Sequence, residues 1–189
     1  MKELGTLDPR VYEDEDMLVG YPPPAFTPAP TPAPTPSPTY DLSFSQYFNP
    51  GNVEKTEGWA GAIPNVGYGD KDRFAIFSHP VMGIRALGRD IQTKIKSLDG
   101  DLSAIISKYA PPFENPTNDY TKYVTDAVGK SKVAEKDIPA IIKAIIEFEN
   151  DSDMAKGYLQ KGMMKEAMKL VPFDMPAGTT LPEARELAK

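Results

Sequence analysis

The chain has 189 residues, no cysteine, one histidine and a net charge of −6. This acidic balance argues against sequence-independent nucleic-acid binding, which depends on exposed lysine and arginine, and the lack of cysteine excludes disulfides and thiolate metal sites. No apolar run approaches the roughly 20 residues that span a bilayer, and the first residues lack the apolar stretch of a signal peptide. The sequence therefore predicts a soluble, non-secretory protein, and it indicates no metal site and no cofactor.

Residues 1–20 form an acidic N-terminal tail, with six acidic and two basic side chains. Its apolar residues follow neither a helical nor an alternating period, which is typical of a solvated, disordered tail. The alternative is a short docking segment whose apolar side chains fit pockets on a partner. The side chains expected to contact that partner, two of them just beyond the tail, are Val11, Tyr12, Met17, Leu18, Val19, Tyr21 and Phe26.

Residues 21–40 are a proline-rich linker, with nine prolines between Pro22 and Pro38. Proline fixes φ and removes the backbone donor, so neither helix nor sheet forms and polyproline II remains. At about 3.1 Å per residue the linker could reach roughly 50–60 Å. A semi-rigid spacer is the better interpretation, because no basic residues flank the prolines as an SH3-type ligand would require.

Residues 41–189 are predicted to be one mainly α-helical domain with a possible small β-ribbon. Its first residues, 41–48, lead into the turn Asn49-Pro50-Gly51-Asn52, which combines residues that favour turn geometry. A loop is predicted over residues 57–72, anchored in the core by Trp59, and a short strand over residues 73–77.

The longest predicted helix follows an N-cap at Ser78, has Pro80 in its first turn and is 18 residues long. Gly83 and Gly88 weaken this helix, which suggests close packing there. The apolar residues at spacings of three and four are Val81, Ile84, Leu87, Ile91, Ile95 and Leu98. Further helices are predicted over 102–109 behind an Asp101 cap, 115–128, 138–149 behind an Asp137 cap, 154–171, and after a Thr180–Glu183 capping box.

The carboxylates of the fourth helix differ in their expected environment. Glu147 lies four residues after Lys143 and should pair with it. Glu149 instead continues the buried stripe, three residues after Ile146. It either bonds to a neighbouring loop, an arginine or backbone donors, or lies partly desolvated in a cleft, where its pKa would rise toward that of a general acid. The single histidine, His79, is interpreted as a turn residue.

Several motifs together resemble a family of bacteriophage and prophage virion structural proteins, over roughly residues 49–170. They are Asn49–Asn52, Trp59-Ala60-Gly61, Phe74–Phe77, Pro80–Ala86, Tyr109–Asn115 and Ala144–Asn150. The resemblance implies a virion protein made in the host bacterial cytoplasm and present in multiple copies of a symmetric assembly. Residues 1–40 would then contact neighbouring portal, tail or capsid proteins.

Phe74-x-x-Phe77-x-x-Pro80 before an amphipathic helix also resembles the glucosaminidase-type, lysozyme-like peptidoglycan hydrolases. In those enzymes a catalytic glutamate on a helix usually precedes this region, but here the proline-rich linker precedes it. The resemblance would therefore place the catalytic acid C-terminally, at Glu149. The second carboxylate would be Glu114, ahead of Asp70 or Asp72, and the substrate-binding side chains would be Trp59, Tyr109 and Tyr120.

Two hypotheses follow, and the favoured one is a non-catalytic virion component tethered by residues 1–40. The alternative is a virion-associated peptidoglycan hydrolase that opens the cell wall during genome entry. A groove that joins Glu149 to Trp59 or tyrosines would favour the hydrolase. Burial of Glu149 against Arg73, Arg85 or backbone donors, with no groove, would favour the structural role.

Overall fold

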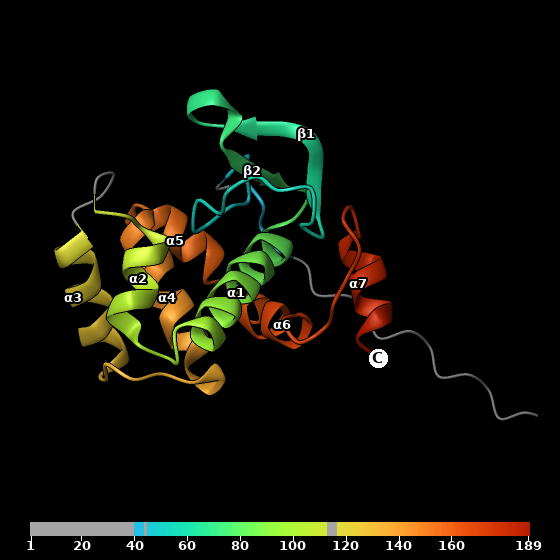
Figure 1. Ribbon diagram of the computed structural model, residues 1–189. Helices are drawn as coiled ribbons and strands as arrows, with labels where there is room; N and C mark the ends of the chain where they lie inside the picture. The colour runs from blue at the N-terminus through green and yellow to red at the C-terminus, as the bar shows by residue number, and fades with distance from the viewer. Residues whose placement is uncertain (1–39, 44, 113–116) are drawn as a thin grey trace, which may run out of the picture. The chain divides into compact units, whose positions relative to one another are not determined.

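A computed structural model describes residues 40–43, 45–112 and 117–189 of the chain (Figure 1). The predicted acidic tail, nearly all of the proline-rich linker, their seven partner-binding residues and Glu114 lie outside these residues. The described part is mainly helical with one small antiparallel ribbon, which confirms the predicted fold class. None of its helices is both long and apolar enough to cross a membrane.

The β-ribbon pairs β1 (Ala62–Tyr68) with β2 (Phe74–Phe77), and Ala62 lies opposite Phe77. A tight turn joins the strands, with left-handed backbone at Gly69 and Lys71. The predicted strand at 73–77 is therefore confirmed, but the loop predicted over 57–72 is wrong at residues 62–68, which form β1. β1 was missed because it contains proline and asparagine and is mostly solvent-exposed, so it has no alternating apolar pattern.

α1 (Pro80–Ser97) is the central helix, and its 18 residues confirm the predicted helix and its length. It packs against α2, α4, α6 and β2. The N-cap is His79 rather than the predicted Ser78, because the His79 Nδ1 atom accepts the Val81 N–H at 3.1 Å. His79 therefore has a local structural role at the start of the helix.

Close packing of the α1 glycines is also confirmed. A Cβ atom on Gly83 would lie 1.8 Å from the Phe48 carbonyl oxygen, and one on Gly88 would lie 2.6 Å from a Val171 methyl carbon. Both positions require the smallest residue because other segments cross the helix there.

The remaining helices surround α1 and complete the core (Figure 1). They are α2 (Leu102–Tyr109), α3 (Thr117–Val128), α4 (Ile138–Glu149), α5 (Ser152–Tyr158), α6 (Met163–Leu170) and α7 (Leu181–Leu187). Asp101 caps α2 as predicted, through its side chain and the Ala104 N–H. The Asp137 side chain instead accepts the Ala134 N–H, so the predicted cap of α4 is wrong in its bonding.

One helix was predicted over 154–171, and the structure corrects this to two. The chain turns between α5 and α6, where Gly162 has φ of 91° and the Met163 N–H bonds to the Gln160 carbonyl. A left-handed glycine ends helical geometry at low cost, and the apolar stripe alone did not reveal the break. The capping box of α7 is confirmed, because both the N–H and the hydroxyl of Thr180 bond to Glu183 at 2.8 Å.

Candidate functional site

A cavity of about 570 Å³ lies where the C-terminal ends of α2 and α4 approach β2, α1 and the chain before the ribbon. Glu149, Trp59 and Tyr109, three of the residues predicted for a site, all line it. The other lining residues are Gly51, Asn52, Val53, Glu54, Thr56, Arg73, Phe74, Asp90, Lys94, Lys108, Ala110 and Pro111. The predicted Asp70 and Asp72 lie on the ribbon turn and do not line the cavity.

The turn at residues 49–52 forms one wall because asparagine side chains fix it to two elements. Asn49 donates to the carbonyls of Val53 and Ala75, each at 2.9 Å. Asn150, just after α4, donates to the Pro50 carbonyl at 2.7 Å. This turn therefore joins the end of α4 to the β-ribbon and sets the position of Glu149.

Glu149, the last residue of α4, is held by a chain of side-chain hydrogen bonds. The Asn52 side-chain Nδ2 donates to Glu149 Oε2 at 3.0 Å, and its Oδ1 accepts the Tyr68 hydroxyl at 2.7 Å. The Tyr68 hydroxyl thereby fixes the orientation of the Asn52 amide. No arginine pairs with Glu149 among the residues that the structure describes.

Burial raises the pKa of the Glu149 carboxyl, and the Asn52 amide and the Tyr120 hydroxyl oppose this rise only in part. Tyr120 is fully buried, and its hydroxyl makes no hydrogen bond of standard geometry to any described residue. A half-buried carboxyl with a raised pKa retains a proton at a higher pH than an exposed one, as a general acid requires.

The aromatic residues occupy different depths. Trp59 is half-buried and donates its indole N–H to the Glu54 carbonyl at 2.8 Å. The Tyr109 hydroxyl bonds to the Gly51 carbonyl. Tyr120 lies behind the wall, stacked on Phe148 with ring centroids 4.0 Å apart, so it supports the site without lining it.

The sequence did not identify the charged pairs of the cavity. Asp90 pairs with Lys94 one turn along α1, and Glu54 pairs with Arg73 at 2.7 Å. Helical spacing could have indicated the first pair, but the second joins residues 19 positions apart. The cavity therefore offers a half-buried carboxyl, two internally neutralised pairs and aromatic surface.

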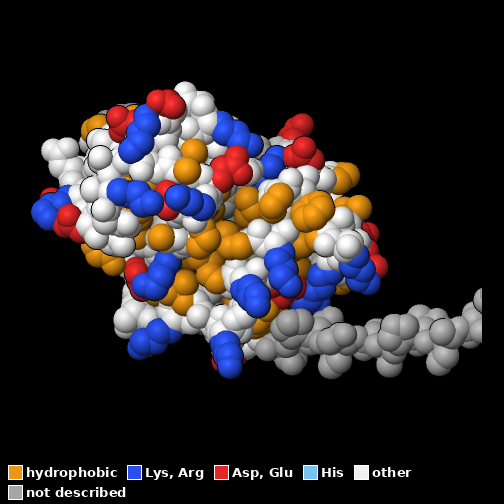
Figure 2. All heavy atoms as spheres, turned by 90° about the horizontal axis from the view of Figure 1, so that it is seen from below, with side chains coloured by type: hydrophobic (Ala, Val, Ile, Leu, Met, Phe, Trp, Pro, Cys, Tyr) orange, Lys and Arg blue, Asp and Glu red, His pale blue; other side chains and the backbone are white. Residues whose placement is uncertain are grey.

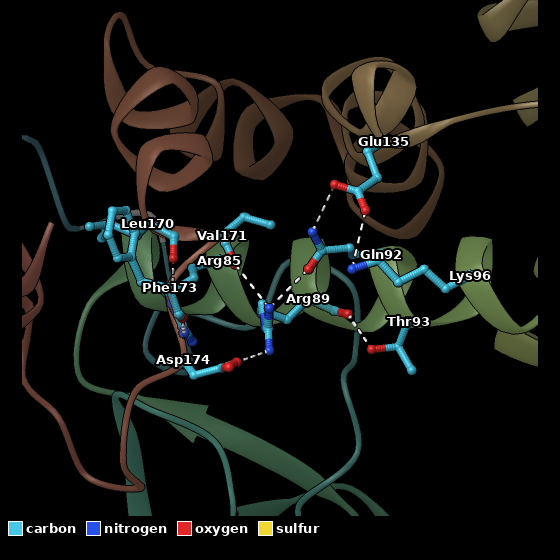
Figure 3. Close-up of polar contacts among 10 residues, drawn as sticks. All are labelled: Arg85, Arg89, Gln92, Thr93, Lys96, Glu135, Leu170, Val171, Phe173 and Asp174. Carbon is cyan, nitrogen blue, oxygen red and sulfur yellow. Dashed lines mark hydrogen bonds and ion pairs between the residues drawn. The ribbon is translucent and has the colours of Figure 1, made fainter.

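Arg85, a candidate partner of Glu149, is engaged elsewhere (Figure 3). It donates to the carbonyls of Leu170 and Phe173 at 3.1 and 2.5 Å. Burial lowers the pKa of its guanidinium to about 10. Because Arg85 holds the chain that follows α6, it has no part in the cavity.

A polar ladder continues along the same side of α1 (Figure 3). Arg89 pairs with Asp174 and donates to Gln92 at 2.9 Å, and Gln92 donates to Glu135 at 3.1 Å. These contacts hold the segment before α4 and the chain after α6 against α1, which is a structural role. The predicted pair of Lys143 with Glu147 is also present, at 2.6 Å.

The described residues contain no group of three or more histidine, aspartate or glutamate side chains placed to hold a metal ion.

No protein-family model matches the chain. The chain is similar to Protein P5 of Pseudoalteromonas phage PM2, with 34% identity over 112 residues. The alignment covers 56% of this chain and 69% of the phage protein.

Proposed function

Since this chain belongs to the family of Protein P5 of Pseudoalteromonas phage PM2, we propose that it is a structural component of a bacteriophage virion. The observation that carries this proposal is the family relationship to a phage protein. The virion location, the assembly role and the multiple copies in a symmetric particle extend that relationship. No catalytic step is required for this role.

Residues 1–40 are the proposed anchor to neighbouring virion proteins, such as portal, tail or capsid subunits. The point where they join the domain supports this role. The Tyr40 hydroxyl donates to Glu166 at 2.6 Å, and Arg185 pairs with the same carboxylate at 2.6 Å. Asp41 and Gln160 exchange two further hydrogen bonds, at 3.0 and 2.7 Å. We call residues 1–40 the arm. Because the hydrogen bonds of Tyr40 and Asp41 hold its end to the domain, a contact between the arm and a neighbouring protein would also hold the domain in place.

Particle incorporation tests the proposal directly. Particles of the phage that encodes this chain would be purified by density gradient and analysed for the chain by mass spectrometry. We expect the full chain to sediment with particles and a chain lacking residues 1–37 to be lost from them. Glu149→Gln is the matched control, because a structural component does not need this carboxyl for incorporation. Absence of the full chain from particles would contradict a virion location.

A peptidoglycan glycosidase is the second candidate, favoured by the cavity that joins Glu149 to Trp59 and Tyr109. The Glu149 carboxyl would protonate the glycosidic oxygen, and the exposed part of Trp59 would stack on a sugar ring. Glycosidases of this type use a second carboxyl group. Glu114 remains the candidate from the sequence. Asp90 and Glu54 also line the cavity, but Lys94 neutralises the first and Arg73 the second.

A cell-wall assay separates the two candidates. Purified full chain would be added to Gram-negative cell walls, and loss of turbidity and release of reducing ends would be followed beside Glu149→Gln. Turnover that falls at least about 100-fold in the variant, with an unchanged circular dichroism spectrum, is expected of a glycosidase. No turnover with either protein would rule this candidate out for that wall and leave the assembly role.

A further inference from the structure

A second hollow, away from the Glu149 cavity, lies between α6 and the start of α4. It has a volume of about 440 Å³ and is lined by Pro139, Met164, Lys165, Met168 and Lys169. We call it the Met–Lys groove. Figure 2 views the domain from below Figure 1, and the face that it shows has hydrophobic side chains gathered among lysine and arginine side chains.

The groove combines apolar surface with unpaired positive charge. Lys165 and Lys169 are exposed, and neither makes an ion pair with any residue of the described ranges. By contrast, Lys143 nearby on α4 pairs with Glu147. Methionine side chains adapt to varied apolar partners, and free lysines beside them favour a partner that carries carboxylates.

The chain itself contains a segment of matching chemistry. Residues 1–20 have a net charge of −4, which is most of the excess negative charge of the whole protein. Apolar side chains directly flank the acidic run Glu13–Asp16, with Val11-Tyr12 before it and Met17-Leu18-Val19 after it. We propose that the Met–Lys groove of one copy binds residues 1–20 of a second copy. This inference rests on the proposed role of the arm as an anchor, and it names the anchor's partner.

The length of the linker favours a second copy over the same one. The arm joins the domain at Tyr40, which bonds to Glu166 of α6. Residues of the same short helix line the groove. A domain of this size is about 40 Å across, whereas a polyproline II linker of residues 21–40 extends roughly 50–60 Å. The semi-rigid spacer that the sequence predicts would favour contact of the tail with a neighbour's groove over contact with its own. Repetition of this contact would link copies in a chain or ring.

Sedimentation velocity on the full chain tests the inference. We expect self-association that weakens with salt, because rim charges contribute to the contact. Lys165→Glu combined with Lys169→Glu should weaken it about tenfold or more, as should deletion of residues 1–20. The matched control is Lys55→Glu with Lys71→Glu, which places the same charge change on exposed positions near the β-ribbon and should leave association unchanged.

A charge exchange distinguishes a specific contact from a general effect of charge. Adding Glu13→Lys, Asp14→Lys, Glu15→Lys and Asp16→Lys to the groove variant should restore self-association of that chain. A monomeric full chain, or association that the groove variant leaves unchanged, would overturn the inference. Loss of binding to phosphatidylglycerol vesicles in the groove variant, with self-association unchanged, would assign the groove to a lipid surface instead. A monomeric chain that still enters particles would overturn this inference alone and leave the virion role intact.

Discussion

The protonation state of Glu149 affects the stability of the fold as well as any catalytic role of its carboxyl, because the side chain is partly buried. Burial raises the pKa of Glu149 in the folded protein. A raised folded-state pKa means that the protonated carboxyl favours folding at acidic pH, and that this contribution disappears as pH rises through the folded pKa. We therefore expect Glu149→Gln, which stays neutral and can still accept the Asn52 hydrogen bond, to be more stable than the unaltered chain at neutral pH.

The comparison must be made across pH to be diagnostic. Urea unfolding of both proteins should show the largest stability difference at neutral pH and a shrinking difference toward pH 4. A constant difference at all pH values would show that the change acts through packing rather than through ionisation of Glu149.

Asn52 is the residue on which the position of Glu149 depends. It has φ of 50° and bonds to both Glu149 and Tyr68. Asn52→Ala leaves both partners unpaired in partly buried surroundings, so we expect a loss of about 1–3 kcal/mol in the free energy of unfolding. It should also raise the pKa of Glu149 further, because the Asn52 amide lowers it.

Asn52→Gly provides the matched control for the backbone. Glycine tolerates the positive φ but makes neither hydrogen bond, so the difference between the two variants isolates the strain. Denaturant unfolding gives the stabilities, and NMR titration of the Glu149 carboxyl gives its pKa. Asn52→Gly with stability equal to that of the unaltered chain would show that the hydrogen bonds contribute nothing measurable.

At the scale of the elements, α1 allows two substitutions to be compared, because Gly83 packs against backbone and Gly88 packs against side chains. Alanine at either position should gain up to about 1 kcal/mol in helix propensity. At Gly83 the new Cβ meets the Phe48 backbone oxygen, which cannot move without shifting the chain. At Gly88 it meets side-chain atoms of Val171, Ile142 and Met168. We expect Gly83→Ala to lose about 2–3 kcal/mol and Gly88→Ala about 1 kcal/mol or less.

Thermal unfolding followed by circular dichroism measures both variants under the same conditions. Equal losses would show that the backbone near Phe48 yields as easily as the side chains near Gly88. A stabilised Gly83→Ala variant would contradict the close approach of that segment to α1.

The elements that the sequence predicted well are those whose stability depends on a local pattern. α1 and α2 each combine an apolar stripe with start or stop residues, so the length of α1 and both ends of α2 were predicted correctly. β1 exists because it pairs with β2, and no local pattern marks it. The break before α6 depends on one glycine that tertiary packing places in left-handed geometry.

The candidate site was also predictable only in part, because a local sequence pattern marks some of its residues and tertiary contacts bring in the others. Glu149 could be identified because it extends a buried helical stripe. Asn52 and Asp90 join the site through the approach of segments far apart in sequence, to which helical periodicity gives no guide. Tyr120 was expected at the surface of the site, but aromatic stacking on Phe148 places it inside the core.

At the scale of the whole molecule, the described domain includes contacts made by the first residues after the linker. Tyr40 bonds to Glu166, and the buried Tyr158 donates its hydroxyl to Ser45 at 3.1 Å. A chain that begins at residue 38 retains both contacts, whereas one that begins at residue 46 loses them. We expect the first truncation to melt within about 1–2 °C of the full chain and the second to melt several degrees lower.

Differential scanning calorimetry of the three chains at one concentration measures these shifts, and a dilution series separates folding from association. A large loss of melting temperature on removal of residues 1–37 at low concentration would mean that the arm stabilises its own domain. That outcome would contradict docking of the tail on a second copy, because a tail bound in trans stabilises the domain only when the concentration allows association. An effect that grows with protein concentration would instead support contact between copies.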